Sequence, residues 1–168
     1  MFKKSIGFIF SVLCSLCSMD LQAQYSNSTQ TAPSQANQIN WITNYADAQK
    51  KSMDTSKPIL ILFTGTNWCP ACMKLEREVL THPRFASGVA NSFVFLKAEF
   101  TDPSDDAINR SAYKPLLDRY NIDAFPSIVV TDAQGQQLFT VEYQKGGPDV
   151  YVRDLTLKLA NVRGITQQ

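Results

Sequence analysis

The amino-acid sequence predicts an α/β fold in which strands and helices alternate along the chain. An apolar run, Ile59–Phe63, is followed by a helical pattern at residues 70–80 and then by a second apolar run, Phe93–Glu99. A strand, a helix and a strand in this order form a parallel pair with a right-handed crossover. Two shorter runs, Ile128–Thr131 and Gln137–Val141, enclose a turn that contains glycine and predict a β-hairpin.

Residues 1–23 have the pattern of a secretory signal peptide. Lys3 and Lys4 precede an almost uncharged, mostly apolar stretch from Ile6 to Met19, and Ala23 offers a small residue at a cleavage site. The apolar stretch has about 14 residues, fewer than the roughly 20 that a membrane-spanning helix needs. We therefore expect cleavage after Ala23 and export to the periplasm of a Gram-negative cell.

Residues 24–39 are polar and read as a flexible leader, because they offer too few apolar side chains to offset the entropy of ordering. Residues 40–168 then form one domain, since their number suits a single core. Asn40 is placed to cap a first helix. The apolar face of that helix is predicted to contain Trp41, Ile42, Tyr45 and Ala48.

The run Ile59–Phe63 is the best candidate for a central strand, because it is continuously apolar and has the length of a strand buried on both faces. A helix follows from Pro70 to about Leu80, with the proline in the first turn, where its missing N–H costs nothing. A shorter helix is expected after Pro83. Residues 101–110 are polar and rich in turn formers.

The C-terminal part of the chain predicts two more helices. The first runs from Tyr113 to Tyr120 and directs Leu116, Leu117 and Tyr120 inward. The last follows Gly146–Pro148. Its apolar positions are Val152, Leu155, Leu159 and Val162.

Charge and cysteine content narrow the function. The chain has 16 Lys and Arg against 15 Asp and Glu, so its formal charge of +1 gives no reason to expect nucleic acid or anionic lipid as a partner. Two cysteine pairs have Cys-x-x-Cys spacing, and Cys14 and Cys17 lie in the signal, where cysteine acts as a small apolar residue. A disulfide between Cys69 and Cys72 would close too short a loop to stabilise the fold much, so this pair indicates redox chemistry.

Cys69 and Cys72 are the candidate catalytic residues. At a helix N-terminus, Cys69 faces unpaired amides and the positive end of the helix dipole, which favour the thiolate and lower its pKa. We expect Cys69 to be the nucleophile. Cys72, nearly a turn further, is expected to be more buried and to act as the resolving thiol. Pro70 and Ala71, between the two cysteines, influence thiolate stability and with it the reduction potential.

The same spacing also serves metal and haem sites, so other functions stay open. Structural zinc would need four ligands and only His82 could join the pair, while haem attachment would need histidine where Met73 stands. His82 reads as a solvated loop residue and not as a base. A carrier of a soft metal such as Cu(I), with Met53 and Met73 as further sulfur ligands, remains an alternative. So does a structural domain whose disulfide merely persists.

Trp68 and Pro126, each next to the end of a predicted strand, are further candidates for residues that bind substrate. Trp68, directly before Cys69, is either an apolar platform for incoming peptide or ordinary packing at the end of a strand. Pro126, directly before the hairpin, either starts a strand or has a cis peptide bond, which would be a more deliberate feature.

Together these residues resemble the thioredoxin superfamily over roughly Asn40 to Val162. The resemblance rests on the apolar strand, on Trp68-Cys69-Pro70-Ala71-Cys72 at a helix start, and on Tyr120-x-Ile122 followed by Pro126 and a hairpin. The segment from Lys57 to Cys69, with Leu75-Glu76-Arg77-Glu78-Val79 after it, is similar more narrowly to DsbH-type periplasmic thiol-disulfide oxidoreductases.

The resemblance implies a thioredoxin fold, with a central mixed β-sheet flanked by helices and a cis-proline loop at Pro126 facing the helix N-terminus that carries the cysteines. It also implies that Phe125 offers its backbone to the substrate chain as an added strand. The expected function is reduction of disulfides in exported proteins through a Cys69 mixed disulfide. A membrane thiol reductase would donate the electrons, no cofactor or metal is needed, and a monomer is the default. A net oxidant or isomerase of the same fold stays open.

The sequence departs from the thioredoxin pattern at two positions. Thioredoxins carry a buried aspartate six residues before the first cysteine, where this chain has Phe63, so proton transfer must differ; Glu99 or water are candidates to replace it. Phe125 is bulkier than the residue usually found before the cis proline, which is expected to narrow substrate choice.

Overall fold

The structure is a computed structural model that describes residues 38–166. The predicted signal peptide, residues 1–23, and all but the last two residues of the predicted leader, 24–39, lie outside the described residues. Ile39, at the end of that leader, is partly buried against the hydrophobic core. Within residues 38–166, no helix combines the length and the apolar character needed to cross a membrane.

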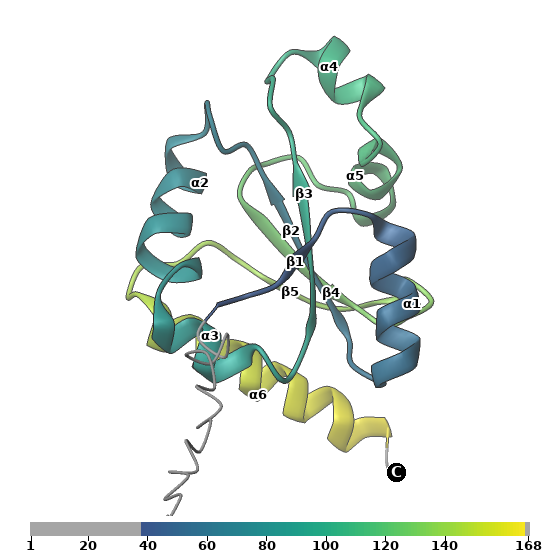
Figure 1. The fold of residues 1–168 in the computed structure, drawn as a ribbon, viewed down its shortest axis with the longest axis vertical. Helices are drawn as coiled ribbons and strands as arrows, with labels where there is room; N and C mark the ends of the chain where they lie inside the picture. The colour runs from purple at the N-terminus through teal and green to yellow at the C-terminus, as the bar shows by residue number, and fades with distance from the viewer. Residues whose placement is uncertain (1–37, 167–168) are drawn as a thin grey trace, which may run out of the picture. The chain divides into compact units, whose positions relative to one another are not determined.

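Five strands form one mixed sheet in the order β1-β3-β2-β4-β5 (Figure 1). At its centre, β2 (Ile59–Thr64) pairs in parallel with β3 (Val94–Glu99) and antiparallel with β4 (Ser127–Thr131). The edges are β1 (Trp41–Ile42), parallel to β3, and β5 (Gln137–Val141), antiparallel to β4. Every residue of β2 is buried, which confirms the predicted central strand.

Helices cover both faces of this sheet (Figure 1). One face is covered by α2 (Pro70–Leu75), the π-helical turn η2 (Glu76–Leu80), α3 (Pro83–Val89) and α6 (Pro148–Thr166). The other is covered by α1 (Tyr45–Thr55) and α5 (Lys114–Tyr120), with α4 (Asp105–Arg110) beside α5. The fold is therefore the predicted thioredoxin fold.

The N-terminal element differs from its prediction. Trp41 and Ile42 do not begin a helix but pair with Phe95 and Leu96 of β3. The Trp41 ring meets the Phe95 ring edge-on at 5.5 Å, a long-range contact that outweighs the local helical spacing. The helix begins only at Tyr45, because Asn44, and not Asn40, caps it.

The segment 101–110, predicted as polar turns, contains the short helix α4. Its cap is Ser104, whose side chain accepts a hydrogen bond from the Ala107 N–H at 3.4 Å. The helix lacks the apolar stripe by which longer helices are recognised in a sequence, so the capping residue Ser104 is its main local signal.

The predicted hairpin is present, and α5 holds its turn in place. Gly135 has a φ of +82°, which suits glycine, and its carbonyl accepts a hydrogen bond from the Tyr120 hydroxyl at 3.0 Å. The Tyr45 hydroxyl lies 3.3 Å from that of Tyr120. Burial is the main reason why the pKa of Tyr120 is raised well above its usual value.

Candidate active site

Cys69 and Cys72 form a disulfide where β2 gives way to α2. Cys69 is the N-cap of α2, and its own N–H donates to the Gly65 carbonyl at 3.0 Å, which fixes the connecting turn. Pro70 occupies the first helical turn, where its fixed φ suits the helix and no N–H is required. The backbone therefore places the pair at a helix start, as the sequence predicts.

Main-chain amides point at both sulfur atoms. The Cys72 N–H donates to Cys69 Sγ at 3.1 Å, and the Gly65 N–H donates to Cys72 Sγ at 3.5 Å. Hydrogen bonds of this kind strengthen when the acceptor becomes a thiolate. Cys69 is 6% exposed and Cys72 is 2% exposed, so a partner can reach Cys69 more readily, although access to both is narrow.

The cis-proline loop lies against the disulfide. The Phe125–Pro126 peptide bond is cis, and the Phe125 carbonyl oxygen lies 3.7 Å from Cys69 Sγ. At the far end of the loop, the Ser127 hydroxyl donates to the Ala124 carbonyl at 2.7 Å. A backbone carbonyl thus stands next to the sulfur at which exchange would begin.

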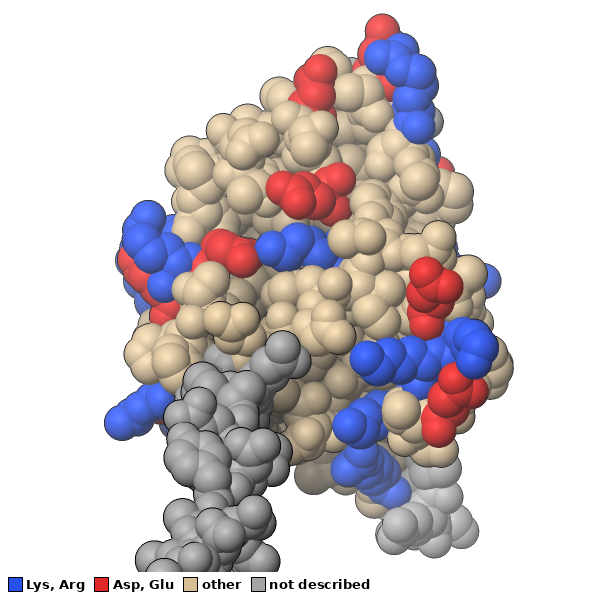
Figure 2. Space-filling model, viewed as in Figure 1, with Lys and Arg blue, Asp and Glu red and all other residues tan. Residues whose placement is uncertain are grey.

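Trp68 is held from three sides. Its indole N–H donates to the Phe100 carbonyl at 2.8 Å, and its ring meets the Phe125 ring edge-on at 5.6 Å. Beneath it, a Cβ on Gly65 would lie 2.5 Å from two ring atoms of Trp68, so this close approach requires glycine. The indole is packed at the end of β2 and stays partly exposed, so a role of its exposed part as a platform for peptide remains a prediction. The surface over the N-terminal end of α2 carries few charged residues (Figure 2).

The two residues of β2 that lie six and seven positions before Cys69, Phe63 and Leu62, carry no carboxylate. Phe63 is fully buried in the core beneath α1 and α5, with its ring 6.4 Å from that of Tyr120. The preceding residue, Leu62, belongs to the core beneath α2. Glu99 is half-buried at the end of β3 and lines a cavity of about 300 Å³. With burial as the larger cause, it helps to raise the pKa of Tyr113.

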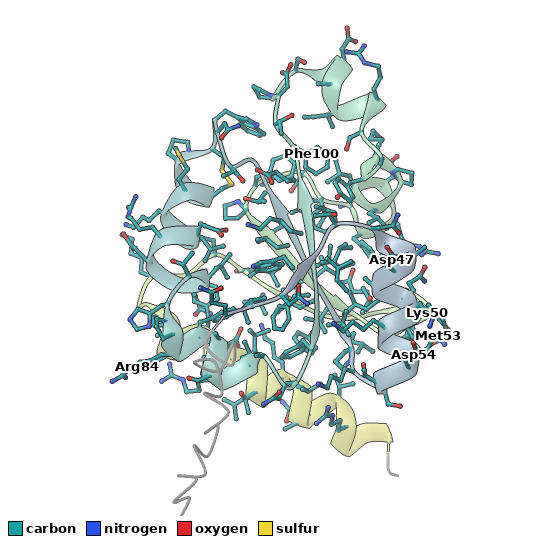
Figure 3. All side chains as sticks on the ribbon, viewed as in Figure 1. Asp47, Lys50, Met53, Asp54, Arg84 and Phe100 are labelled. Carbon is teal, nitrogen blue, oxygen red and sulfur yellow. A yellow bond between two sulfur atoms is a disulfide. The ribbon has the colours of Figure 1, made fainter. Side chains whose placement is uncertain are left out.

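Other sequence candidates lie away from the disulfide or serve the fold. His82 caps α3, where its Nδ1 accepts a hydrogen bond from the Arg84 N–H at 3.2 Å. Met53 is 57% exposed on the outer side of α1 (Figure 3), on the face of the sheet opposite to α2. Met73 is 40% exposed on α2. Among residues 38–166, no three His, Cys, Asp or Glu side chains gather as metal ligands would.

Sequence reasoning missed a partly buried ion pair between the C-terminal end of α2 and β3. Lys97 Nζ bonds both carboxylate oxygens of Glu76, at 3.1 and 3.2 Å, and the two side chains are 16% and 29% exposed. The ammonium also lies 5.4 Å from the Trp41 ring centroid. A lysine inside the apolar run Phe93–Glu99 was the signal, because a charge there needs a partner.

A thioredoxin fold that holds a cysteine disulfide at a helix start, opposite a cis proline, defines a thiol-disulfide oxidoreductase. The chain belongs to the thioredoxin-like domain family, whose model matches residues 45–146.

The relatives found by sequence are bacterial Dsb proteins. The chain is 29% identical to the disulfide bond reductase DsbH of Chlamydia pneumoniae over 149 residues, which are 87% of this chain and 89% of DsbH. It is 24% identical to the thioredoxin-related protein DsbJ of the same organism over 139 residues, 82% of this chain but only 38% of DsbJ.

Solved structures give the same fold. A DsbH oxidoreductase matches with a TM-score of 0.66 and 28% identity, covering 80% of this chain and 93% of that one. The oxidised C-terminal domain of DsbD from Neisseria meningitidis matches with a TM-score of 0.55 and 15% identity, covering 71% and 99%; this likeness supports the fold alone.

Proposed function

We propose that the protein is an exported reductase that opens disulfides of other exported proteins through Cys69. The observation that carries the proposal is the position of Cys69 Sγ, with an amide N–H at 3.1 Å on one side and the Phe125 carbonyl at 3.7 Å on the other. The first group favours the thiolate, and the second offers a hydrogen-bond acceptor to an extended substrate chain.

The first step starts from the reduced pair. The Cys69 thiolate attacks one sulfur of the substrate disulfide, an S–S bond forms between enzyme and substrate, and the other substrate sulfur leaves as a thiolate that takes up a proton. Phe125 would align the substrate backbone, Pro126 would keep this carbonyl turned toward Cys69, and the exposed part of Trp68 would contact side chains next to the substrate cysteine.

The second step closes the cycle on the enzyme. Cys72, as a thiolate, attacks Cys69 Sγ, the mixed disulfide breaks and the substrate leaves with two thiols. The enzyme then holds the Cys69–Cys72 disulfide, which is the state of the structure. Two electrons from a dithiol donor, which we propose to be a membrane thiol reductase, restore the reduced pair.

The reducing direction is supported by similarity to DsbH, a protein described as a disulfide bond reductase and alike over most of both chains. Export to the periplasm is supported by the signal pattern of residues 1–23, and cleavage there would leave the polar segment 24–39 ahead of the domain. Action as a monomer belongs to the same proposal.

The test uses the mature chain, residues 24–168, in insulin reduction with a thiol donor. We expect turnover, and a Cys69/Cys72 reduction potential near about −270 mV, whereas about −120 mV would indicate an oxidant. Tight stoichiometric copper binding without turnover would replace the proposal with a metal carrier.

Two matched variants assign the roles of the sulfurs. Cys69→Ser is expected to abolish turnover and to form no mixed disulfide. Cys72→Ser is expected to attack but not to resolve, so that a Cys69 mixed disulfide with the substrate accumulates and is seen by mass spectrometry. Turnover by Cys69→Ser at the wild-type rate, or the two variants behaving in the opposite way, would refute the assignment.

A further inference from the structure

We propose that Phe100 is a positioning residue. It keeps the Phe125 carbonyl and Trp68 in the positions next to Cys69 that binding of an extended substrate chain requires. The inference rests on the proposed function, since it concerns how that function's substrate is aligned. Phe100 follows β3, is 3% exposed and lies at the upper end of the sheet in Figure 3.

The backbone of Phe100 ties it to the loop that carries the cysteines. Its N–H donates to the Thr64 carbonyl at 2.8 Å, extending the pairing of β2 and β3 by one residue. Its own carbonyl accepts the indole N–H of Trp68 at 2.8 Å. Phe100 therefore holds both the end of the strand that enters the loop and the residue that directly precedes Cys69.

The side chain of Phe100 reaches the other half of the site. Its ring centroid lies 5.1 Å from that of Phe125, whose ring in turn lies 5.6 Å from that of Trp68. The centroid of the Phe100 ring also lies 6.0 Å from that of Tyr113, whose hydroxyl donates to the Thr43 carbonyl. The ring thus supports Phe125 from a fixed point in the core.

These contacts close a triangle around the nucleophile. Trp68, Phe100 and Phe125 each contact the other two, and the corner at Phe125 is the residue whose carbonyl lies 3.7 Å from Cys69 Sγ. Two of the three corners come from loops, whereas Phe100 is anchored to the sheet. Removing the Phe100 ring would allow Phe125 and its carbonyl to move. The cysteines and the N–H groups that donate to them would stay in place.

A small reagent needs only the Cys69 sulfur, but a polypeptide also needs the aligned carbonyl. The role of Phe100 therefore predicts a selective loss. In Phe100→Leu, kcat/KM for insulin reduction is expected to fall about tenfold, while the rate at which iodoacetamide alkylates reduced Cys69 stays within about twofold. Phe100→Tyr, which keeps the ring, is expected to retain most of the insulin activity.

Phe95→Leu is the matched control. Phe95 lies on β3, which Phe100 directly follows, is 4% exposed and also has edge-on aromatic partners, but it belongs to the core beneath α2 and α3. Its variant is expected to keep both rates within about twofold of the wild type after correction for the folded fraction. If Phe100→Leu is unfolded at the assay temperature, Phe125→Leu, at a half-buried residue, breaks this ring contact together with the contact to Trp68, and the same selective loss is expected.

The outcomes separate this inference from the proposed function. No insulin reduction by the wild-type protein would remove the proposed function itself. If the wild type is active but Phe100→Leu behaves like Phe95→Leu, the positioning role is overturned and the proposed reductase function stands. The same holds if insulin reduction and alkylation fall by the same factor in Phe100→Leu.

Discussion

Replacing Gly65 by alanine tests whether the packing beneath Trp68 is as tight as the structure has it. A Cβ at this position would lie 2.5 Å from two atoms of the indole and 3.1 Å from a third. Real Cβ atoms do not approach a ring so closely, so the indole must move. Because Trp68 is held by the Phe100 carbonyl at 2.8 Å and by the Phe125 ring, its movement breaks contacts on both sides.

The expected cost combines three terms. Overpacking of a close contact costs about 1–3 kcal/mol, and the loss of the indole hydrogen bond costs about 1 kcal/mol. Alanine restricts the unfolded chain and returns about 0.4–1 kcal/mol. The net destabilisation of about 2 kcal/mol corresponds to a fall in Tm of roughly 6–8 °C for a domain of this size.

Urea unfolding followed by circular dichroism measures this loss. Gly164→Ala is the control: Gly164 lies in α6, a Cβ there meets nothing within 4 Å, and alanine is expected to stabilise by up to about 1 kcal/mol. In a Trp68→Leu background, the cost of Gly65→Ala is expected to fall below about 0.5 kcal/mol, because the clash is gone. An equal cost in both backgrounds would show that the indole is not what excludes a side chain at position 65.

Two further predictions concern charge. Glu76→Gln leaves the Lys97 ammonium, 16% exposed, without its carboxylate and should lower the free energy of unfolding in urea by about 1–3 kcal/mol. Asp54→Asn breaks an exposed pair with Lys50 and should leave the free energy of unfolding nearly unchanged; equal effects of the two substitutions would contradict the burial argument. The raised pKa of Tyr120 means that the unfolded chain loses this proton first, so the stability it contributes is present below about pH 10 and is lost as pH rises further. Tyr120→Phe should therefore lose less stability than the wild type between about pH 9.5 and 11.5, and parallel curves would refute the assignment.

The parts of the fold that could be predicted from the sequence are those that depend on residues close together along the chain. The continuous apolar run Ile59–Phe63 can be satisfied only between two layers of helices, and the spacing of Cys69 and Cys72 after it places the pair at a helix start. Trp41 and Ile42 were assigned wrongly because their spacing to Tyr45 and Ala48 is helical, while their real partners lie more than 50 residues away, in β3.

The sequence points to residues of the proposed site only where a single side chain carries a chemical group. Phe100 has no polar group and follows a strand, so nothing local separates it from any other core phenylalanine. Its importance arises from the carbonyl that meets Trp68 and from the ring that meets Phe125, two contacts that exist only after β3 and the cis-proline loop have come together. Residues that act by position are therefore the part of a site that a sequence alone conceals.

The absence of a carboxylate at Phe63 affects the resolving step of the proposed mechanism. Counting back from Cys69 leads to Phe63, but the side chain that shares a core with α2 is that of Leu62, so neither residue can accept the proton of Cys72. The polar groups that face the sulfurs are the N–H groups of Gly65 and Cys72, at 3.5 and 3.1 Å, and the Phe125 carbonyl, at 3.7 Å. A main-chain N–H stabilises a thiolate without taking its proton, so in the proposed mechanism that proton passes to another acceptor, such as water or the departing substrate thiolate. The geometry of the loop, held by Gly65 and Trp68, should accordingly govern the rate of exchange more than any titrating side chain apart from the two cysteines.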